Sequence, residues 1–221
     1  MTEQAPPRVA RRPGRPPQAS SEETRARILD AALSSFARAG FAGARLKDIA
    51  DGAGVHTALV HHYFGDKGNL YAAVLERALA PLKESGVTLL SPDLDVRMVM
   101  EGFVTLLVQF FNERRDIATL MARESLAGGE QLRLVMEETV RPLFQGALAF
   151  FGAARARGDV PDLDPAQMVF TVVGAVAVYF VHGSLVAQVT GEDPFTPEAV
   201  ERRRTELVRM LHALLSPRVT P

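Results

Sequence analysis

Cysteine and tryptophan are absent from the 221-residue sequence. Without cysteine the chain can form no disulfide, no thiolate metal site and no cysteine nucleophile, and we expect a cytoplasmic location because such a composition suits a reducing compartment. Aromatic residues are also few, at 7% of the chain. Hydrophobic residues nevertheless make up 47%, which argues against disorder and allows a sizeable core.

The sequence also lacks the motifs that mark common enzyme sites. There is no phosphate-binding loop, no dinucleotide-binding glycine pattern and no H-E-x-x-H metal motif, and the residues around Ser184 do not form a nucleophile elbow. His61 and His62 are adjacent, but neighbouring side chains on a helix point about 100° apart and no third ligand is near. We therefore expect no enzymatic activity, no cofactor and no metal.

The formal net charge of −1 conceals an uneven distribution of charge. Residues 1–80 carry 11 basic and 8 acidic side chains, whereas residues 81–221 carry 14 basic and 18 acidic ones. The first 20 residues contain four arginines and five prolines and no apolar segment typical of a secretory signal, so we expect a flexible basic arm there. A basic end attached to an acidic remainder favours a module that binds a polyanion.

A helix is predicted directly after the arm. Ser20 and Glu23 have the spacing of a capping box, which marks a helix N-terminus. Apolar residues then recur at helical spacing over residues 28–36, and Gly40 ends the run.

Two short helices and a connecting helix are predicted next. The short helices are expected at about residues 45–51 and 56–63, separated by Gly-Ala-Gly at 52–54. A longer helix capped by Asp66 should follow and be interrupted at Pro81. This order of helices is typical of a helix-turn-helix domain.

The remainder of the chain is predicted to be helical throughout, because no window shows strand alternation flanked by hairpin turns. The fold class is therefore all-α. We divide the chain into the arm (1–20), a helix-turn-helix domain (21–81) and a larger helical domain (82–221). The longer helices are expected near residues 67–86, 94–113, 115–126, 130–157, 165–190 and 197–215.

Apolar residues within the helix-turn-helix are placed to hold two crossing helices together. Ala50 is small enough for a close crossing, and Gly54 suits a left-handed turn between the helices. Val55 and Val60 would anchor the second helix in the core. The opposite face of that helix would then carry His56, Thr57, Leu59 and His61 outward.

This stretch resembles the DNA-binding domain of the TetR/AcrR family of bacterial transcription regulators. The resemblance covers about residues 21–80 with specific motifs, and beyond them only size and helical character. The matching positions are Asp48-Ile49-Ala50, Ala53-Gly54-Val55, Tyr63-Phe64, Lys67 and Leu70.

The resemblance implies that the second short helix lies in the major groove of DNA. Base edges would be faced by His56, Thr57, Ala58 and Leu59. Thr57 can hydrogen-bond to either type of base pair, and Leu59 offers an apolar contact to a thymine methyl. Phosphates would be bound by His61, His62, Tyr63 and Lys67, although Tyr63 can instead belong to the core. Arg45 and Lys47 also lie where the family contacts DNA.

Two positions depart from the family pattern. Gly43-Ala44-Arg45 stand where a Ser/Thr cap is frequent, so the capping hydrogen bond is lost. His61 stands where a tyrosine is frequent; a neutral histidine can still donate to a phosphate, and a protonated one binds more strongly. The sequence therefore leaves two alternatives for His61, with and without a contact to a DNA phosphate.

The arm contains a further DNA-binding candidate. Arg15 belongs to an Arg-Pro-Gly-Arg-Pro sequence at 12–16 that resembles the short Gly-Arg-Pro element found in AT-rich minor grooves. A solvated tail is the alternative interpretation.

Residues 165–191 carry no charged side chain over 27 positions. As one helix this stretch would be roughly 40 Å long, enough to cross a bilayer. Scattered polar residues and acidic flanks argue against a membrane span. We expect instead a helix buried between the core and a second subunit.

The resemblance also implies a homodimer. In the family the last two long helices pair with their copies, and the helices near 165–190 and 197–215 match them by position. A two-fold dimer would present two recognition helices roughly 34–36 Å apart and would require a near-palindromic double-stranded operator.

An effector site is implied inside the larger helical domain. The candidate lining residues are Phe103, Leu107, Phe110, Met121, Phe144, Tyr179 and His182, each of which can alternatively be a plain core residue. Tyr179 and His182 carry polar tips that need partners when buried, and Arg123 or Glu124 could pair with a charged ligand. Because the candidates include few charges, a small apolar or aromatic effector is favoured.

The sequence thus predicts a transcriptional repressor that an effector releases from its operator. An activator or an effector-independent DNA-binding protein is the main alternative, and a membrane-anchored DNA-binding protein is a remote one.

Overall fold

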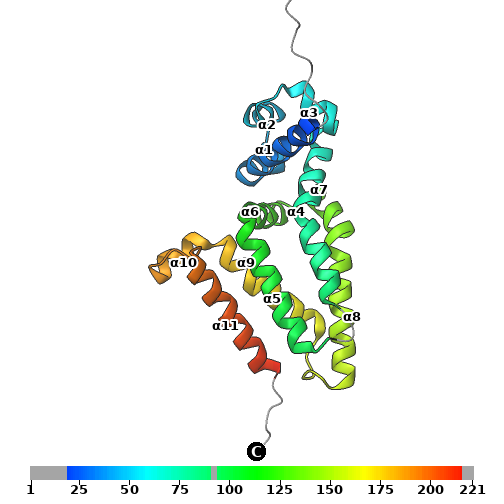
Figure 1. The fold of residues 1–221 in the computed structure, drawn as a ribbon, viewed down its shortest axis with the longest axis vertical. Coiled ribbons are helices and arrows are strands. Elements are labelled where there is room, and N and C mark those ends of the chain that lie inside the picture. Colours follow the sequence, from blue (N-terminus) through cyan, green and yellow to red (C-terminus); the bar gives the residue numbers. More distant parts are fainter. Residues whose placement is uncertain (1–18, 91–93, 216–221) are drawn as a thin grey trace, which may run out of the picture.

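Helices make up every regular element of the computed structural model, which describes residues 19–90 and 94–215. This confirms the all-α prediction. In Figure 1 three helices form a small domain at the top, α4 runs down from it, and the remaining helices form a larger domain below. Residues 1–18, with the arm's Arg15, lie outside the described residues.

The small domain consists of α1 (Ala19–Gly43), α2 (Leu46–Ala53) and α3 (Thr57–Phe64). Its core is apolar and fully enclosed, with the side chains of Ile28, Phe36, Ile49, Ala50 and Val60 buried. Gly54 ends α2 in the left-handed conformation (φ 66°, ψ 38°), as predicted for the turn. The side chain of Ser20 is not among those described, so the capping box stays a prediction.

Helix α1 is broken close to its end. Gly40 has φ 72° and ψ 173°, a backbone conformation that suits glycine because it has no Cβ. The predicted stop at this residue is therefore a break, after which one further helical turn continues to Gly43.

Helix α4 (Lys67–Leu89) connects the two domains. Its N-terminus is capped as predicted, because the side chain of Asp66 accepts a hydrogen bond from the Asn69 N–H at 2.8 Å. The predicted interruption at Pro81 is wrong, since the helix continues through this residue to Leu89. Proline removes one backbone hydrogen bond, but α4 also packs against α1, α5, α7 and α8, which help to hold it as one helix.

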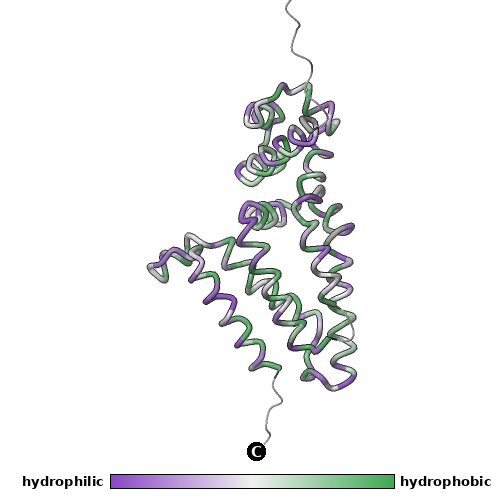
Figure 2. Tube along the Cα trace, viewed as in Figure 1, coloured by the Kyte–Doolittle hydropathy of each residue, from purple (hydrophilic) through white to green (hydrophobic). Residues whose placement is uncertain are grey.

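The larger domain begins with α5 (Val96–Glu113) and α6 (Arg115–Leu126). The single helix expected over 130–157 is divided into α7 (Glu130–Val135), a π-helical turn η1 (Met136–Val140) and α8 (Arg141–Arg157). Figure 2 shows hydrophobic residues concentrated where these helices face one another and hydrophilic residues on outer faces.

The last helices are α9 (Pro165–Val181), α10 (Gly183–Thr190) and α11 (Pro197–Leu215). The uninterrupted helix expected over 165–190 is wrong, because α9 and α10 meet at an angle of 78°. The bend occurs at His182, and at the next residue, Gly183, the ring of Phe195 occupies the space that a Cβ would need. Neither helix alone, nor any other single helix in the described ranges, has the length and hydropathy of a membrane span; only the bent pair passes when both halves are counted together.

Candidate DNA-binding surface and enclosed cavity

Helix α3 is fixed to the small domain by two of its residues and presents the others outward. Val60 and Phe64 are buried in the core. The side chains of His56, Ala58, His61 and His62 are exposed, and those of Thr57, Leu59 and Tyr63 are half-buried. The predicted base-reading and phosphate-binding residues of α3 are thus brought together on one surface.

Two of these side chains also form hydrogen bonds within the protein. The His61 Nδ1 lies 2.7 Å from the Gly65 carbonyl oxygen, which can only accept, so Nδ1 carries a hydrogen. Nε2 is then an acceptor in the neutral ring and can donate only when the ring is protonated. The Tyr63 hydroxyl lies 2.9 Å from the Ser21 hydroxyl and links α3 to the start of α1. Tyr63 therefore contributes to the packing of the domain as well as to its surface.

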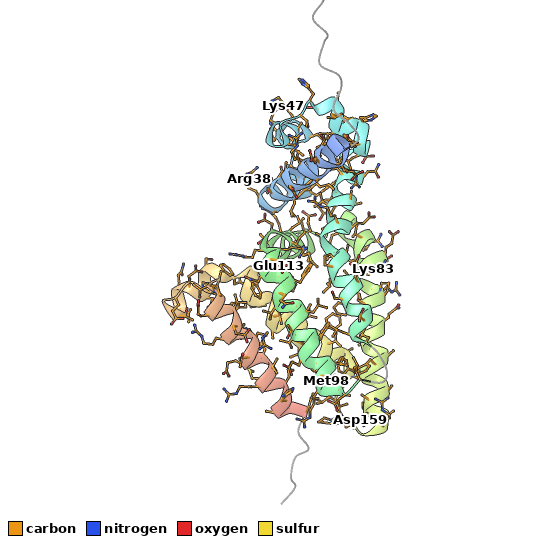
Figure 3. All side chains as sticks on the ribbon, in the orientation of Figure 1. Arg38, Lys47, Lys83, Met98, Glu113 and Asp159 are labelled. Carbon is orange, nitrogen blue, oxygen red and sulfur yellow. The ribbon has the colours of Figure 1, made fainter. Side chains whose placement is uncertain are left out.

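Arg45 and Lys47 lie at the start of α2. Arg45 occupies the N-cap position without a side-chain capping bond and is exposed. Lys47 extends from the end of the molecule that carries the small domain (Figure 3) and donates to the Asp51 carboxylate at 2.7 Å. This hydrogen bond raises the pKa of Lys47 above its ordinary value, so the lysine stays charged but is already partnered.

Lys67 makes more contacts within the protein than the sequence suggested. Its Nζ lies 4.7 Å from the centre of the Phe41 ring and donates to the carbonyl oxygens of Ala44, at 3.2 Å, and Ala42, at 3.4 Å. An ammonium group has three hydrogens, so most of its hydrogen-bonding capacity is used at the junction of α1 and α2.

The larger domain encloses an apolar cavity of about 110 Å³. Its walls come from α4, α5, α6, the π-helical turn, α8 and α9. Every lining residue is apolar or glycine: Leu79, Leu82, Gly86, Leu89, Leu90, Val99, Phe103, Leu106, Leu107, Phe110, Phe111, Met121, Met136, Val140, Leu143, Phe144, Ala147, Val169 and Val173. The cavity therefore offers shape and contact area but no hydrogen bonds from side chains.

Five of the seven effector-site candidates line this cavity, namely Phe103, Leu107, Phe110, Met121 and Phe144. Tyr179 and His182 do not. The Tyr179 hydroxyl donates to the Pro194 carbonyl at 3.2 Å, and Arg203 lies over its ring. His182 is exposed at the bend between α9 and α10.

The sequence reasoning missed the contribution of α4 to the cavity. Leu79, Leu82, Gly86 and Leu89 follow one another at spacings of three or four residues, which places them on one face of the helix. The expected interruption at Pro81 hid this pattern. Met136 and Val140 were missed for another reason, because a π-helical turn changes which residues share a face.

Arg123 and Glu124 do not line the cavity either. Arg123 donates to the carbonyl oxygens of Arg38, at 2.5 Å, and Ala37, at 3.4 Å. Glu124 accepts from the Phe41 N–H at 2.8 Å. Both residues therefore join α6 to α1 instead of facing a ligand.

The last three helices carry several exposed hydrophobic side chains. Large hydrophobic side chains that are more than half exposed occur on α9, α10 and α11: Phe170, Val178, Leu185, Val189, Met210 and Leu214. Between Phe170 and Val178 lies Gly174, beside which an added Cβ would meet nothing within 4 Å. An exposed apolar surface of this kind is typical of a protein–protein interface.

Two family descriptions match the chain. Residues 28–74 match "Bacterial regulatory proteins, tetR family". Residues 95–214, more than half of the chain, match "HTH-type transcriptional dual regulator CecR, C-terminal domain". The second match falls on the region where the sequence reasoning recognised only size and helical character.

Individual proteins show the same relationship. The HTH-type transcriptional repressor SCO4008 of Streptomyces coelicolor is 31% identical over 156 residues, covering 71% of this chain and 77% of its own. The crystal structure of SCO4942 from Streptomyces coelicolor has a TM-score of 0.68 at 28% identity and covers 88% of this chain and 99% of its own. AibR, solved with isovaleryl coenzyme A and operator DNA, has a TM-score of 0.69 at 16% identity, covers 88% and 99% of the two chains, and supports the fold.

Proposed function

This chain belongs to the TetR family of bacterial transcriptional regulators, and we propose that it is a repressor released from its operator by a small apolar or aromatic effector. One observation carries the proposal. Helix α4 packs Tyr71 against Phe36 and Phe41 of α1 and then lines the cavity with Leu79 and Leu82. A ligand that alters packing around the cavity therefore acts on the helix that supports the DNA-binding surface.

The surface of α2 and α3 reads the operator in this proposal. Thr57 and Leu59 contact base edges, and His62 and Arg45 contact phosphates. His61 reaches a phosphate only when its ring is protonated, because its Nδ1 hydrogen is already donated to Gly65 and Nε2 must then carry the second hydrogen. Tyr63, Lys47 and Lys67 contribute less freely, because each already has a protein partner. The arm with Arg15 would add a minor-groove contact.

The protein acts as a homodimer through the apolar face of α9, α10 and α11. Pairing this face with its copy would bury side chains such as Phe170 and Val178, and Gly174 would allow the two helices to approach closely. The dimer would present two copies of α3 to successive major grooves, so the operator is near-palindromic.

The cavity lining defines the class of effector. A charged or strongly polar molecule would leave its polar groups unpaired among leucine, valine and phenylalanine side chains, at a cost of several kcal/mol. A dry apolar cavity of about 150 Å³ is known to bind benzene, and the cavity here is of that order. A neutral aromatic or aliphatic molecule of this size fits, and a larger one requires rearranged side chains.

The operator is the first thing to identify. The purified protein is mixed with fragmented DNA from its source at about 150 mM salt, where non-specific binding is weak, and the retained fragments are sequenced. An enriched near-palindrome supports a specific dimeric regulator. No enrichment from folded protein contradicts the proposal that the effector-free form binds DNA.

The effector response is then tested by reciprocity. If a neutral aromatic molecule weakens operator affinity by some factor, the operator must weaken the affinity for that molecule by the same factor. A molecule that binds the cavity without changing operator affinity would contradict the proposed release.

The sign of regulation needs its own test, because the C-terminal match is to a regulator described as dual. A reporter gene placed behind the selected operator is measured with and without the protein. Lower expression in the presence of the protein supports repression, and higher expression supports activation.

A further inference from the structure

A surface groove lies between α4 and α5, next to the enclosed cavity (Figure 1). Its volume is about 490 Å³, and two of its lining residues, Leu89 and Leu106, also line the cavity. These two leucine side chains therefore stand between the cavity and the groove. We refer to Leu89 and Leu106 together as the leucine wall.

In contrast to the cavity, the groove carries hydrogen-bonding side chains. Ser85 and Thr88 come from α4, and Thr105 comes from α5. Thr88 donates to the Glu84 carbonyl oxygen at 3.3 Å, whereas the hydroxyls of Ser85 and Thr105 have no hydrogen-bond partner within the described parts of the chain. Thr105 is half-buried and directly precedes Leu106, so its hydroxyl is placed to bind a polar group that emerges beside the leucine wall.

The charge at the groove disfavours an anion. Glu101 is exposed and is the charged member of the groove lining. Its carboxylate lies 3.8 Å from Arg204 of α11, which binds Glu201 more closely, at 2.6 Å. The negative charge of Glu101 is thus only partly neutralised, and it would repel a carboxylate or phosphate group but not a neutral one.

The leucine wall is built so that Leu89 can move. Leu89 is the last residue of α4, and the ends of helices fray because their last carbonyl groups have no partner within the helix. One of its methyl groups rests on α5 at Gly102, where an added Cβ would lie only 2.6 Å away. Leu89 is therefore held by a packing contact with bare backbone at the least firmly held turn of its helix.

We propose that the groove is the polar subsite of the effector site, and that a neutral amphipathic effector displaces Leu89 to reach from the cavity into the groove. The aromatic or aliphatic part of the effector lies in the cavity, and a hydroxyl or amide group lies beside Thr105. The cavity alone holds a molecule of about the size of benzene, so a longer effector needs a way out of it. This inference specifies the effector class of the proposed function, and its regulatory meaning rests on that function.

Three matched ligands test the subsite in the full-length protein without DNA. Butylbenzene, 4-phenylbutan-1-ol and 4-phenylbutanoate share one carbon skeleton and differ in the end group, and their dissociation constants are measured by NMR titration. The alcohol should bind within about threefold of the hydrocarbon or more tightly, because its hydroxyl finds partners in the groove. The carboxylate should bind at least about tenfold more weakly than the alcohol.

Two results would overturn the subsite at this stage. An alcohol that loses more than about threefold relative to butylbenzene has its hydroxyl unpaired among apolar side chains. A carboxylate that binds as tightly as the alcohol contradicts the neutral end group.

Thr105→Val tests the hydrogen bond, because it replaces the hydroxyl by a methyl group. It should weaken the binding of 4-phenylbutan-1-ol about five- to tenfold and leave the binding of butylbenzene unchanged. Thr119→Val makes the same substitution at an exposed residue of α6 that lines neither the cavity nor the groove, and should change neither ligand. Equal changes for both ligands in Thr105→Val, or no change for either, would overturn the role of Thr105.

Gly102→Ala tests the leucine wall. The added methyl group takes the space of the Leu89 methyl and displaces the end of this flexible side chain. The ligand then no longer has to displace Leu89 itself, so the affinity for 4-phenylbutan-1-ol should rise about fivefold, whereas benzene, which fits the closed cavity, should gain nothing. Gly152→Ala on α8, where an added Cβ meets nothing within 4 Å, is the control. Equal gains for both ligands in Gly102→Ala, or no gain for the alcohol, would overturn the movable wall.

These measurements use no DNA, so their failure is distinguishable from failure of the proposed function. If the alcohol binds through the groove but leaves operator affinity unchanged, the proposed release is wrong and the subsite stands. If an effector releases the operator while the matched ligands show no use of the groove, the subsite is wrong and the release stands.

Discussion

The DNA-binding surface and the cavity are built in opposite ways. The surface takes exposed polar side chains from one continuous segment, residues 45–67, on helices only two turns long. The cavity takes enclosed apolar side chains from helices spread over residues 79–173. In the proposed function, the first would recognise DNA through directional hydrogen bonds and charge, and the second would recognise an effector through shape. Substitutions in the two regions should therefore affect different properties of the protein.

The largest effect is expected at the proposed dimer face, because operator binding would depend on the second subunit. Val178→Asp places a charge on the apolar face of α9, where this side chain is 57% exposed, and should produce a monomer. Linked binding to two half-sites contributes about 10²–10⁴ in affinity, so operator affinity should fall by about that factor. Mass measurement and an operator titration check this.

The matched control is Gln109→Asp, which adds the same charge to an exposed position on α5. A Val178→Asp protein that stays dimeric would contradict the assigned interface. A monomer with full operator affinity would instead contradict the need for two half-sites.

Cavity residues should respond through stability. Leu107→Ala removes a side chain that is 4% exposed and enlarges an existing void, so the free energy of unfolding should fall by about 3 kcal/mol. The midpoint temperature of thermal unfolding should fall by roughly 10 °C. Leu126→Ala, at a side chain 91% exposed, should change stability by less than about 0.5 kcal/mol. Equal effects would mean that the region around Leu107 is not tightly packed.

DNA-surface residues should respond through specificity instead. Thr57→Ala removes the hydroxyl that we propose to read a base, and should relax discrimination about five- to tenfold at one position per half-site. Thermal stability should hardly change, because the residue is half-buried at the first position of α3. Binding to an operator library measures the change, with Thr119→Ala on α6 as the control. If binding to all operator sequences weakened equally, Thr57 would contact the DNA backbone and not a base.

The smallest effect concerns the ion pair on α2. Asp51→Asn frees Lys47, which now donates to Asp51 at 2.7 Å, and should strengthen operator binding about threefold at low salt with a steeper salt dependence. Asp159→Asn makes the same charge change beside Arg157 at the opposite end of the molecule (Figure 3). If operator affinity increased equally in both variants, the increase would reflect the net charge of the protein alone.

The contrast between the two regions also explains what the sequence could predict. The helix-turn-helix is specified locally, so its short helices, the turn at Gly54 and the cap at Asp66 follow from residues close together in the chain. Five cavity residues were also identified, because aromatic and large apolar side chains in a helical domain gather inside it.

Other features depend on contacts between distant segments, and sequence patterns did not reveal them. Phe195 fills the space beside Gly183, next to the bend between α9 and α10, and α4 continues through Pro81 while it packs against α1, α5, α7 and α8. Glu124 has the pattern of an ordinary helix residue, and only the structure brings it to Phe41, 83 positions away. The DNA and effector contacts themselves remain predictions.

The π-helical turn at Met136–Val140 has a consequence for how such a cavity can change its size. A π-turn holds one residue more than the α-helix on either side of it, and here it supplies Met136 and Val140 to the cavity wall. Deleting a single residue within it would restore regular α-helical winding and rotate the cavity-facing side chains of this segment by about 100° relative to α8. The length of the chain, and not only its composition, is thus a variable through which evolution can fit the same fold to a different molecule.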